Sequence, residues 1–365
     1  MPSRSPLKGL TSSALHRRRA EVLGVAEAAP DAVTMLRVTS AAVARYVPSD
    51  AHGWSAADPG IILPTWPMYL RNVAIKDNNR FWEREFLVED HLLFRDLASR
   101  EVPVGRLHKE TAGLPARSSR YRETLSTQQF GDELRAVLRV SGTVWGLLDL
   151  VRYDDNELFS QVEESFIASL VEPLASTLRA KVMRGPSDTP VTVNGTGFLL
   201  FDADGALTSR NDAAGDWLRE MPNLVAEPDT LPSPVRAVLA YAHAVDMGQQ
   251  PGPARVRVRV RSGQWVVLDA SSIRTSEGTL QGTAVMIAPA SSAEMASIFV
   301  SAYDLSAREQ EITTLLARGT STAKVAADLR LSVFTVRDHI KSIFAKVGVS
   351  SRGELVATLF TQQFR

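Results

Sequence analysis

The chain has 365 residues, a length that suggests two or three domains. Hydrophobic residues make up 44% and charged residues 22%, a composition typical of a globular protein. It contains no cysteine, which excludes disulfide bonds, thiolate zinc sites, iron–sulfur clusters and thiol redox sensing. The 41 basic and 41 acidic residues balance, so the net charge predicts no nucleic-acid or membrane partner, and no apolar run reaches the roughly 20 residues of a membrane span. We therefore expect a cytoplasmic protein.

The first part of the chain contains a predicted hairpin and a long helix. Residues 134–140 and 144–152, separated by Ser141-Gly142-Thr143, are expected to pair as two strands. Ser160 and Glu163 form a capping-box pattern, and apolar residues follow it at helical spacing. Two roles for this helix stay open: packing on its own sheet, or dimerisation and signalling between domains.

A change of composition at residues 184–196, rich in Pro, Gly, Ser and Thr, indicates a linker between domains. After it, two short strands are expected around the turn Asp202-Ala203-Asp204-Gly205, and Asn211 is a candidate helix N-cap. Arginines then alternate with valines from Arg255 to Arg261, the pattern of a strand with one buried face. For this arginine face, a solvated or interdomain surface is favoured over a nucleic-acid site.

The C-terminus carries four helix N-cap signals in close succession. The capping residues are Ser306, Ser321, Ser332 and Ser351. Residues 301–365 contain nine basic and six acidic side chains, so their net charge is 9 − 6 = +3. The sequence therefore predicts a small basic bundle of four helices.

A two-residue turn separates the second of these helices from the third. Only Arg330 and Leu331 precede the Ser332 cap, which matches the short turn of a helix-turn-helix. The third helix carries its polar side chains opposite its apolar stripe, at Arg337, Asp338, Lys341 and Ser342. Such groups hydrogen-bond base edges and phosphates, so this helix is a candidate recognition helix. The alternative is a solvated face of an ordinary bundle.

This segment resembles LuxR-type (GerE-like) transcriptional regulators, on the residues Leu305–Ile312, Leu316–Gly319, Leu331–Ile343 and Lys346–Val349. The resemblance implies an interface with double-stranded DNA. Its expected residues are Ser332, Thr335, Arg337, Asp338, Lys341, Ser342 and Lys346. Of these, Arg337, Asp338 and Lys341 would face the groove. Glu309 and Arg352 resemble the family's structural ion pair.

The longer N-terminal part resembles the sensor half of actinobacterial LuxR-type regulators. Residues 1–183 are similar to a GAF-type domain, on short segments that include Phe81–Phe86, Phe130–Arg135 and Val144–Gly146. Residues 197–290 are similar to a PAS-type domain. The expected fold class is therefore multidomain: an α+β GAF-like domain, an α+β PAS-like domain, and an all-α helix-turn-helix domain at residues 300–365.

Aromatic residues and one arginine are candidates for a ligand pocket in the GAF-like domain. They are Trp54, Trp66, Arg120, Tyr121 and Trp145. A plain aromatic core is the alternative. The nearby carboxylates Glu83, Glu85, Glu89 and Asp90 are expected on one solvated helix face.

No catalytic motif of a recognisable kind occurs. The chain has no G-x-x-x-x-G-K-[ST] loop, no G-x-S-x-G elbow and no H-x-x-x-H pair, so we expect no catalytic residue, metal site or cofactor. The expected function is sequence-specific DNA binding by a homodimeric transcriptional regulator, controlled by a small ligand or by dimer rearrangement. Contact with RNA polymerase stays open. The alternatives are a ligand-free regulator whose front domains only dimerise, and an enzyme with a tethered DNA-binding tail.

Overall fold

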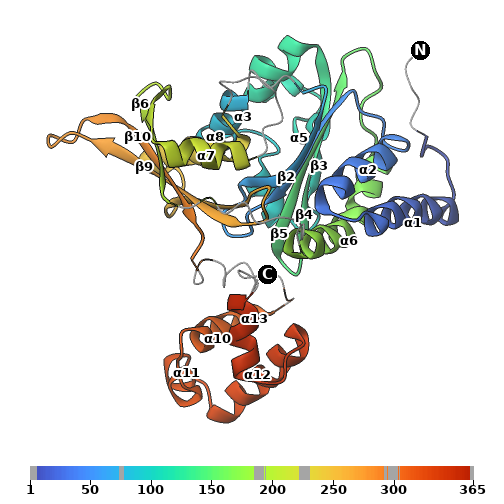
Figure 1. The fold of residues 1–365 in the computed structure, drawn as a ribbon. Coiled ribbons are helices and arrows are strands. Elements are labelled where there is room, and N and C mark those ends of the chain that lie inside the picture. The colour runs from blue at the N-terminus through green and yellow to red at the C-terminus, as the bar shows by residue number, and fades with distance from the viewer. Residues whose placement is uncertain are drawn as a thin grey trace. The chain divides into compact units, whose positions relative to one another are not determined.

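The computed structural model describes residues 6–73, 78–184, 195–221, 231–291 and 305–361, together with residues 193, 294 and 303. Two compact units are present, one with two β-sheets and the other with the C-terminal helices (Figure 1). The expected fold class is confirmed, because two α+β parts are followed by an all-α part. Most of the predicted linker at 184–196 lies outside the described residues, and the domain boundaries stay a prediction.

The first sheet has five strands in the order β2-β1-β5-β4-β3. Their bounds are β1 Ala51–Ala57, β2 Pro64–Arg71, β3 Val104–Arg106, β4 Phe130–Val140 and β5 Thr143–Tyr153. The predicted hairpin is β4–β5. Its turn residues Ser141 and Gly142 both have positive φ, as a type I′ hairpin turn requires.

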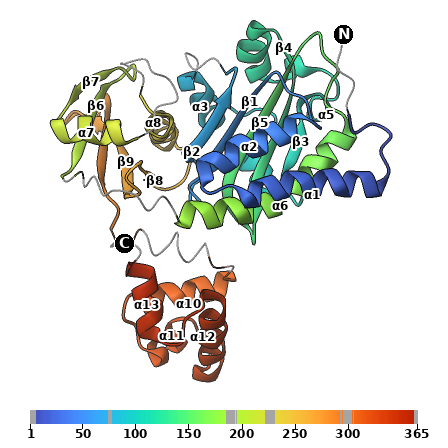
Figure 2. The same cartoon turned by 45° about the vertical axis from the view of Figure 1, so that its right-hand side comes forward.

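Three helices cover one face of this sheet: α1 (Ser12–Ala28), α2 (Ala32–Ala44) and α6 (Gln161–Arg184) (Figure 2). Helix α6 begins at the predicted capping box, where Ser160 and Glu163 exchange hydrogen bonds. Its apolar stripe is buried and packs on β4 and α1. The structure thus shows the first of the two roles considered for this helix, packing on its own sheet.

Shorter helical segments lie along the rest of the first α+β part. They are α3 (Asn78–Leu87), α4 (Phe94–Ser99), α5 (Leu107–Glu110) and the turns Pro115–Arg117 (η2), Tyr121–Leu125 (η3) and Ser126–Gln128 (η4). Apolar side chains of α3, α4 and η3 share a core with inward-facing residues of β4 and β5. Helices α3 and α4 and the segment η3 therefore pack against the sheet through this core.

The second sheet has the order β7-β6-β10-β9-β8, the same order as the first when strands are numbered within each sheet. Its strands are β6 Gly197–Asp202, β7 Leu207–Arg210, β8 Ala254–Arg259, β9 Trp265–Arg274 and β10 Leu280–Pro289. Helix α7 (Asp212–Glu220) begins at the predicted cap, where Asn211 Oδ1 accepts from the Ala214 amide. Helix α8 (Ser233–Asp246) contacts α3 and β2 as well as β8 and β9, so it lies between the two sheets.

The arginines of β8 join the second sheet to the first. Arg257 donates to both carboxylate oxygens of Asp58, a side chain that is fully buried, and its own amide also donates to that carboxylate. Arg259 donates to the carbonyls of Val182 and Met183 near the end of α6, and burial lowers its pKa to about 10. The interdomain interpretation of this arginine face therefore holds for Arg257 and Arg259.

The C-terminal unit contains α10 (Ala307–Ala317), α11 (Thr322–Asp328), α12 (Val333–Val347) and α13 (Arg352–Thr361). Ser306, Ser321 and Ser332 cap the first three helices, and Ser351 accepts from the Glu354 amide at the start of the fourth. Among the described residues, the buried apolar core consists of Leu305, Ile312, Leu316, Val325, Ala326, Val336, Ile343 and Leu355. No helix in the described residues is long and apolar enough to cross a bilayer.

Candidate functional sites

Helix α12 begins and ends where local hydrogen bonding dictates. Ser332 Oγ accepts from the Thr335 amide at 3.0 Å, and Gly348 ends the helix in the left-handed conformation. In the turn before it, Arg330 has a φ of 54°, which lets the chain reverse between α11 and α12. The predicted helix-turn-helix geometry is thereby formed.

The predicted DNA-binding residues divide into two groups. Ser332, Thr335, Arg337, Asp338 and Lys341 are exposed on α12, opposite the buried Val336 and Ile343. Ser342 and Lys346 instead contact α10: Ser342 Oγ donates to Glu309 at 2.6 Å, and Lys346 Nζ donates to it at 2.7 Å. The first group therefore forms one open polar face, and the second also holds two helices together.

Glu309 connects α10 to α12 through its carboxylate. It completes the capping box of α10 and accepts from Ser342 and Lys346. Burial acts to raise its pKa, but the hydrogen bonds from Lys346, Ser342 and Ser306 outweigh burial and lower the pKa to about 2.

The expected ion pair between Glu309 and Arg352 is wrong. Lys346 is the cation that pairs with Glu309, and Arg352 donates to the Leu316 carbonyl near the C-terminal end of α10 at 2.9 Å. The reason lies in the helix ends. Arg352 satisfies an end carbonyl of α10, while the Glu309 carboxylate, in the first turn, faces α12.

Two exposed apolar residues on α12, Val333 and Phe334, are absent from the predicted interface. Phe334 is 75% exposed and lies at the second position of the helix, between the cap Ser332 and the polar face. The sequence does carry a signal for it, since Phe334 falls outside the apolar stripe of Val336, Ile340 and Ile343.

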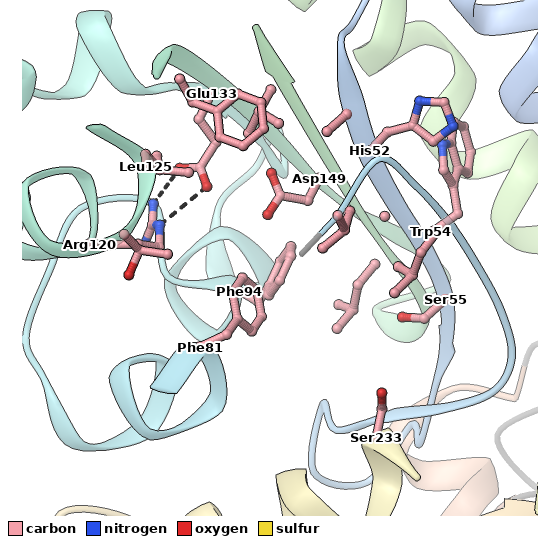
Figure 3. Close-up of a pocket in the computed structure, with 18 of the residues that line it drawn as sticks. His52, Trp54, Ser55, Phe81, Phe94, Arg120, Leu125, Glu133, Asp149 and Ser233 are labelled. Carbon is pink, nitrogen blue, oxygen red and sulfur yellow. Dashed lines mark hydrogen bonds and ion pairs between the residues drawn. The ribbon is translucent and has the colours of Figure 1, made fainter. Parts of the chain in front are cut away.

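A cavity of about 140 Å³ lies between the first sheet and the segments opposite it (Figure 3). Strands β1, β2, β4 and β5 form one wall, and α3, α4, η3 and the first residue of α8, Ser233, form the other. Its lining is mainly apolar, with rings from Phe81, Trp82, Phe94 and Phe130. Such a lining with few polar groups is typical of a small-molecule site.

The structure brings only some of the pocket candidates together. Trp54 and Arg120 line this cavity. Trp66 lines a smaller hollow beside Met221 and Val258, and Tyr121 is half-buried at the edge of the core. Trp145 is buried in the sheet and is not among the lining residues.

A cluster of buried charges forms the polar end of the cavity. Arg120 pairs with Glu133, and Arg135 pairs with Glu133, Glu85 and Asp149. Burial acts to raise the pKa of Glu133, but the two guanidinium groups outweigh it and hold that pKa below its usual value.

The expectation that four acidic residues share one solvated helix face is therefore wrong, because of the four only Glu83 lies exposed on α3. Helix α3 ends at Leu87, so Glu89 and Asp90 lie beyond it; Glu89 is exposed, whereas Asp90 accepts from Ser118, Ser119 and the Arg120 amide. Glu85 is only 3% exposed, because it pairs with Arg135 from β4. Both contacts join residues distant in sequence, which local periodicity does not encode.

Asp149 is the least paired member of the cluster. Its Oδ2 accepts from Arg135 at 3.3 Å, and its Oδ1 is buried without a hydrogen-bond partner in the described part of the chain. Burial, followed by the nearby Glu133, raises its pKa to about 7. The sequence carries a signal for it, since Asp149 alternates with Leu147 and Val151 on the inward face of a strand.

Comparison with known proteins identifies the C-terminal unit. Residues 304–359 match the family model described as "Bacterial regulatory proteins, luxR family". The spore germination protein GerE of Bacillus subtilis is 38% identical over 55 residues, which are 15% of this chain and 74% of GerE. The chain belongs to the LuxR family.

Another relative matches over a similarly short part of the chain. The probable transcriptional regulatory protein NarL of Mycobacterium tuberculosis is 39% identical over 59 residues, 16% of this chain. The chain spans 27% of the length of that relative.

Solved structures similar to this LuxR-family chain include SdiA and a GAF domain. SdiA of Escherichia coli has 12% identity and a TM-score of 0.36, with 96% of this chain and all of that chain covered. The GAF domain of a phosphoenolpyruvate-protein phosphotransferase from Coxiella burnetii has 16% identity and a TM-score of 0.34, with 47% of this chain and 96% of that chain covered.

Proposed function

We propose that the protein is a sequence-specific DNA-binding transcriptional regulator that reads DNA through α12. The observation that carries this proposal is the exposed face of α12, where Arg337, Asp338 and Lys341 follow a capped helix-turn-helix turn. A guanidinium fork can pair with guanine, and a carboxylate can accept from cytosine N4. Ser332 and Thr335, at the start of the helix, are placed to bind phosphates in such a complex.

A homodimer is part of this proposal. One reading helix buries limited surface, and helix-turn-helix regulators gain affinity by placing two such helices on the half-sites of a symmetric operator. The regions that precede α10 supply the remaining surface for subunit contacts.

Control by a small molecule is favoured over purely structural front domains. The supporting observation is the cavity of about 140 Å³, whose mainly apolar wall ends in a cluster of charges. A core built only for stability is better served by close apolar packing than by buried ionic groups. A non-enzymatic role is supported by the relatives, which are named as regulators.

The test is selection of bound duplexes from a random DNA pool by the full-length protein. We expect one enriched motif for the wild-type chain. For Arg337→Ala we expect the motif to be lost or to show weaker base preferences. The control is Arg261→Ala, which removes one exposed positive charge outside the C-terminal unit and should leave the motif unchanged. Failure of the wild-type chain to enrich any motif would contradict the proposal.

A further inference from the structure

Among the described residues, the charge cluster at the cavity holds one more carboxylate than it holds cations. Glu85, Glu133 and Asp149 form the acidic side of the cluster, and Arg120 and Arg135 form its basic side. Glu85, Glu133 and both arginines are at most 3% exposed, while the Asp149 side chain keeps 19% of its surface. We therefore assign the excess negative charge to Asp149, which is the least buried residue of the cluster and lines the cavity.

Both arginines are already engaged by other groups. Arg120 donates to both oxygens of Glu133 and to the His91 carbonyl. Arg135 donates to Glu133, Glu85 and the Leu92 carbonyl before it reaches Asp149 at 3.3 Å. An ionised carboxylate offers about four acceptor positions, and within the described residues the bond from Arg135 occupies one of those at Asp149 while Oδ1 accepts none.

Within the part of the chain that the structure describes, the other titratable groups around the cluster do not balance the negative charge of Asp149. His52 on β1 lines the cavity, but burial lowers its pKa to about 4, so its ring is neutral at physiological pH. Both of its ring nitrogens are engaged, by Ser40 at 2.7 Å and Ser49 at 3.2 Å. Asp90 adds a further negative charge beside Arg120 and accepts from Ser118 and Ser119.

An unmatched buried charge has two ways to reach a lower free energy. It can take up a proton, or a mobile cation can pair with it. Burial favours the first way, because it raises the pKa of Asp149 to about 7. A bound cation would favour the second, because the pair would form in a region that excludes water.

The remaining walls of the cavity determine which uncharged group a cationic ligand can carry. They are apolar and aromatic, including Phe81, Phe130, Leu125 and Leu147. A volume of about 140 Å³ is close to that of an engineered cavity of about 150 Å³ that binds benzene. The space thus suits one six-membered ring with a short substituent, and aromatic faces also attract organic cations.

We propose that this cavity binds a ring-sized primary amine, whose ammonium group donates hydrogen bonds to the Asp149 carboxylate while its ring packs on the apolar wall. The assignment deepens the proposed ligand control and rests on it. Arg120, the cationic pocket candidate from the sequence, is engaged by Glu133, so the charged group offered to a ligand is the acid Asp149.

The test is calorimetric titration of the full-length protein, without DNA, using three ring compounds that differ in charge. Benzylamine is the cation, benzyl alcohol the neutral analogue and benzoate the anion. At slightly alkaline pH we expect benzylamine to bind about tenfold or more tightly than the other two. Its affinity should rise between about pH 6 and about pH 8 as Asp149 ionises, while that of benzyl alcohol stays level.

Two variants separate the carboxylate from the fold. Asp149→Asn should abolish the preference for benzylamine and keep the affinity for benzyl alcohol, which also shows that the cavity is intact. Asp155→Asn, at an exposed position after the same strand, should bind all three compounds as the wild type does. Equal affinity for the three compounds, no binding of any, or a preference that survives Asp149→Asn would overturn the assignment. Because DNA is absent, none of these outcomes bears on motif selection through α12.

Discussion

Arg337 and Lys341 lie on the same exposed face of α12 but differ in how they can bind DNA. A planar guanidinium can form two bonds to guanine, so Arg337→Ala should cost about 1–3 kcal/mol at the selected site and relax specificity at one base pair. Lys341→Ala should weaken binding to all sequences and reduce the salt slope by about 0.9, because one phosphate is no longer neutralised. Binding isotherms on matched and altered duplexes over a range of salt concentrations distinguish the two. A uniform decrease in affinity for Arg337→Ala would mean that it binds phosphate alone.

Lys346 is a less suitable position for such a measurement. Its ammonium group pairs with Glu309 at 2.7 Å, so its removal would disturb the packing of α10 against α12 as well as any bond to phosphate. Lys341 is exposed and on the open face, which makes its substitution the simpler one to interpret.

Asp338 is an acidic residue on the face of α12 that would approach DNA in the proposed complex. Another interaction has to offset the repulsion between its carboxylate and the phosphates. The carboxylate can accept from cytosine N4, whereas pairing with Lys341 along the helix would contribute only about 0.2–0.5 kcal/mol. Asp338→Asn keeps the shape and removes the charge. We expect tighter nonspecific binding and poorer discrimination, measured on cognate and mutated duplexes at one salt concentration. Unchanged discrimination would leave Asp338 with no reading role.

The N-terminal cap of α12 contributes to folding and, in the proposed complex, to DNA binding. Ser332 Oγ accepts from the Thr335 amide, so Ser332→Ala should lower the free energy of unfolding by about 1 kcal/mol. Ser332→Asp keeps an N-cap acceptor and should retain stability, yet its charge should weaken DNA binding through repulsion from phosphates. Denaturant unfolding and DNA titration of both variants check this. If both variants bind DNA equally well, Ser332 lies away from the phosphates.

The contact between α10 and α12 should be sensitive to acid. The pKa of Glu309 is lowered to about 2, so its ionised form stabilises the folded state at pH values above its unfolded pKa of about 4.5. That stabilisation should disappear as the pH falls from about 4.5 towards about 2. Unfolding of the wild type and Glu309→Gln across this range measures it, and the variant should show a smaller dependence. Parallel curves would mean that other carboxylates dominate.

The C-terminal unit should bind DNA weakly when it is separated from the rest of the chain. GerE of Bacillus subtilis consists mostly of the matching region, which supports studying residues 296–365 alone. A single copy lacks the surface that we propose for dimerisation, so its affinity should lie well below that of the full chain. Mobility shifts and sedimentation of both proteins give the comparison. Equal affinities would remove dimerisation from the role of the front domains.

Local sequence patterns predict the helix caps and the hairpin of this protein. The features that they do not predict depend on contacts between residues distant in sequence. The serine caps, the β4–β5 hairpin and the Asn211 cap depend on neighbours within a few residues, and the sequence predicts each of them. The partner of Glu309 and the burial of Glu85 depend on which helix or strand packs opposite, over 37 and 50 residues of sequence. Asp149 is an intermediate case. The sequence predicts that it lies on the inward face of its strand, but not which residues surround it there.

The ion pair between Asp58 and Arg257 has a consequence for recombining such proteins. Exchange of modules succeeds where a cut leaves no buried group without its partner, and a cut between the two sheets separates this pair. A foreign second sheet without a cation at the position of Arg257 would leave a fully buried carboxylate uncompensated. Functional hybrids should therefore arise by exchange after Pro289, where both sheets are inherited together and only the DNA-reading end is new.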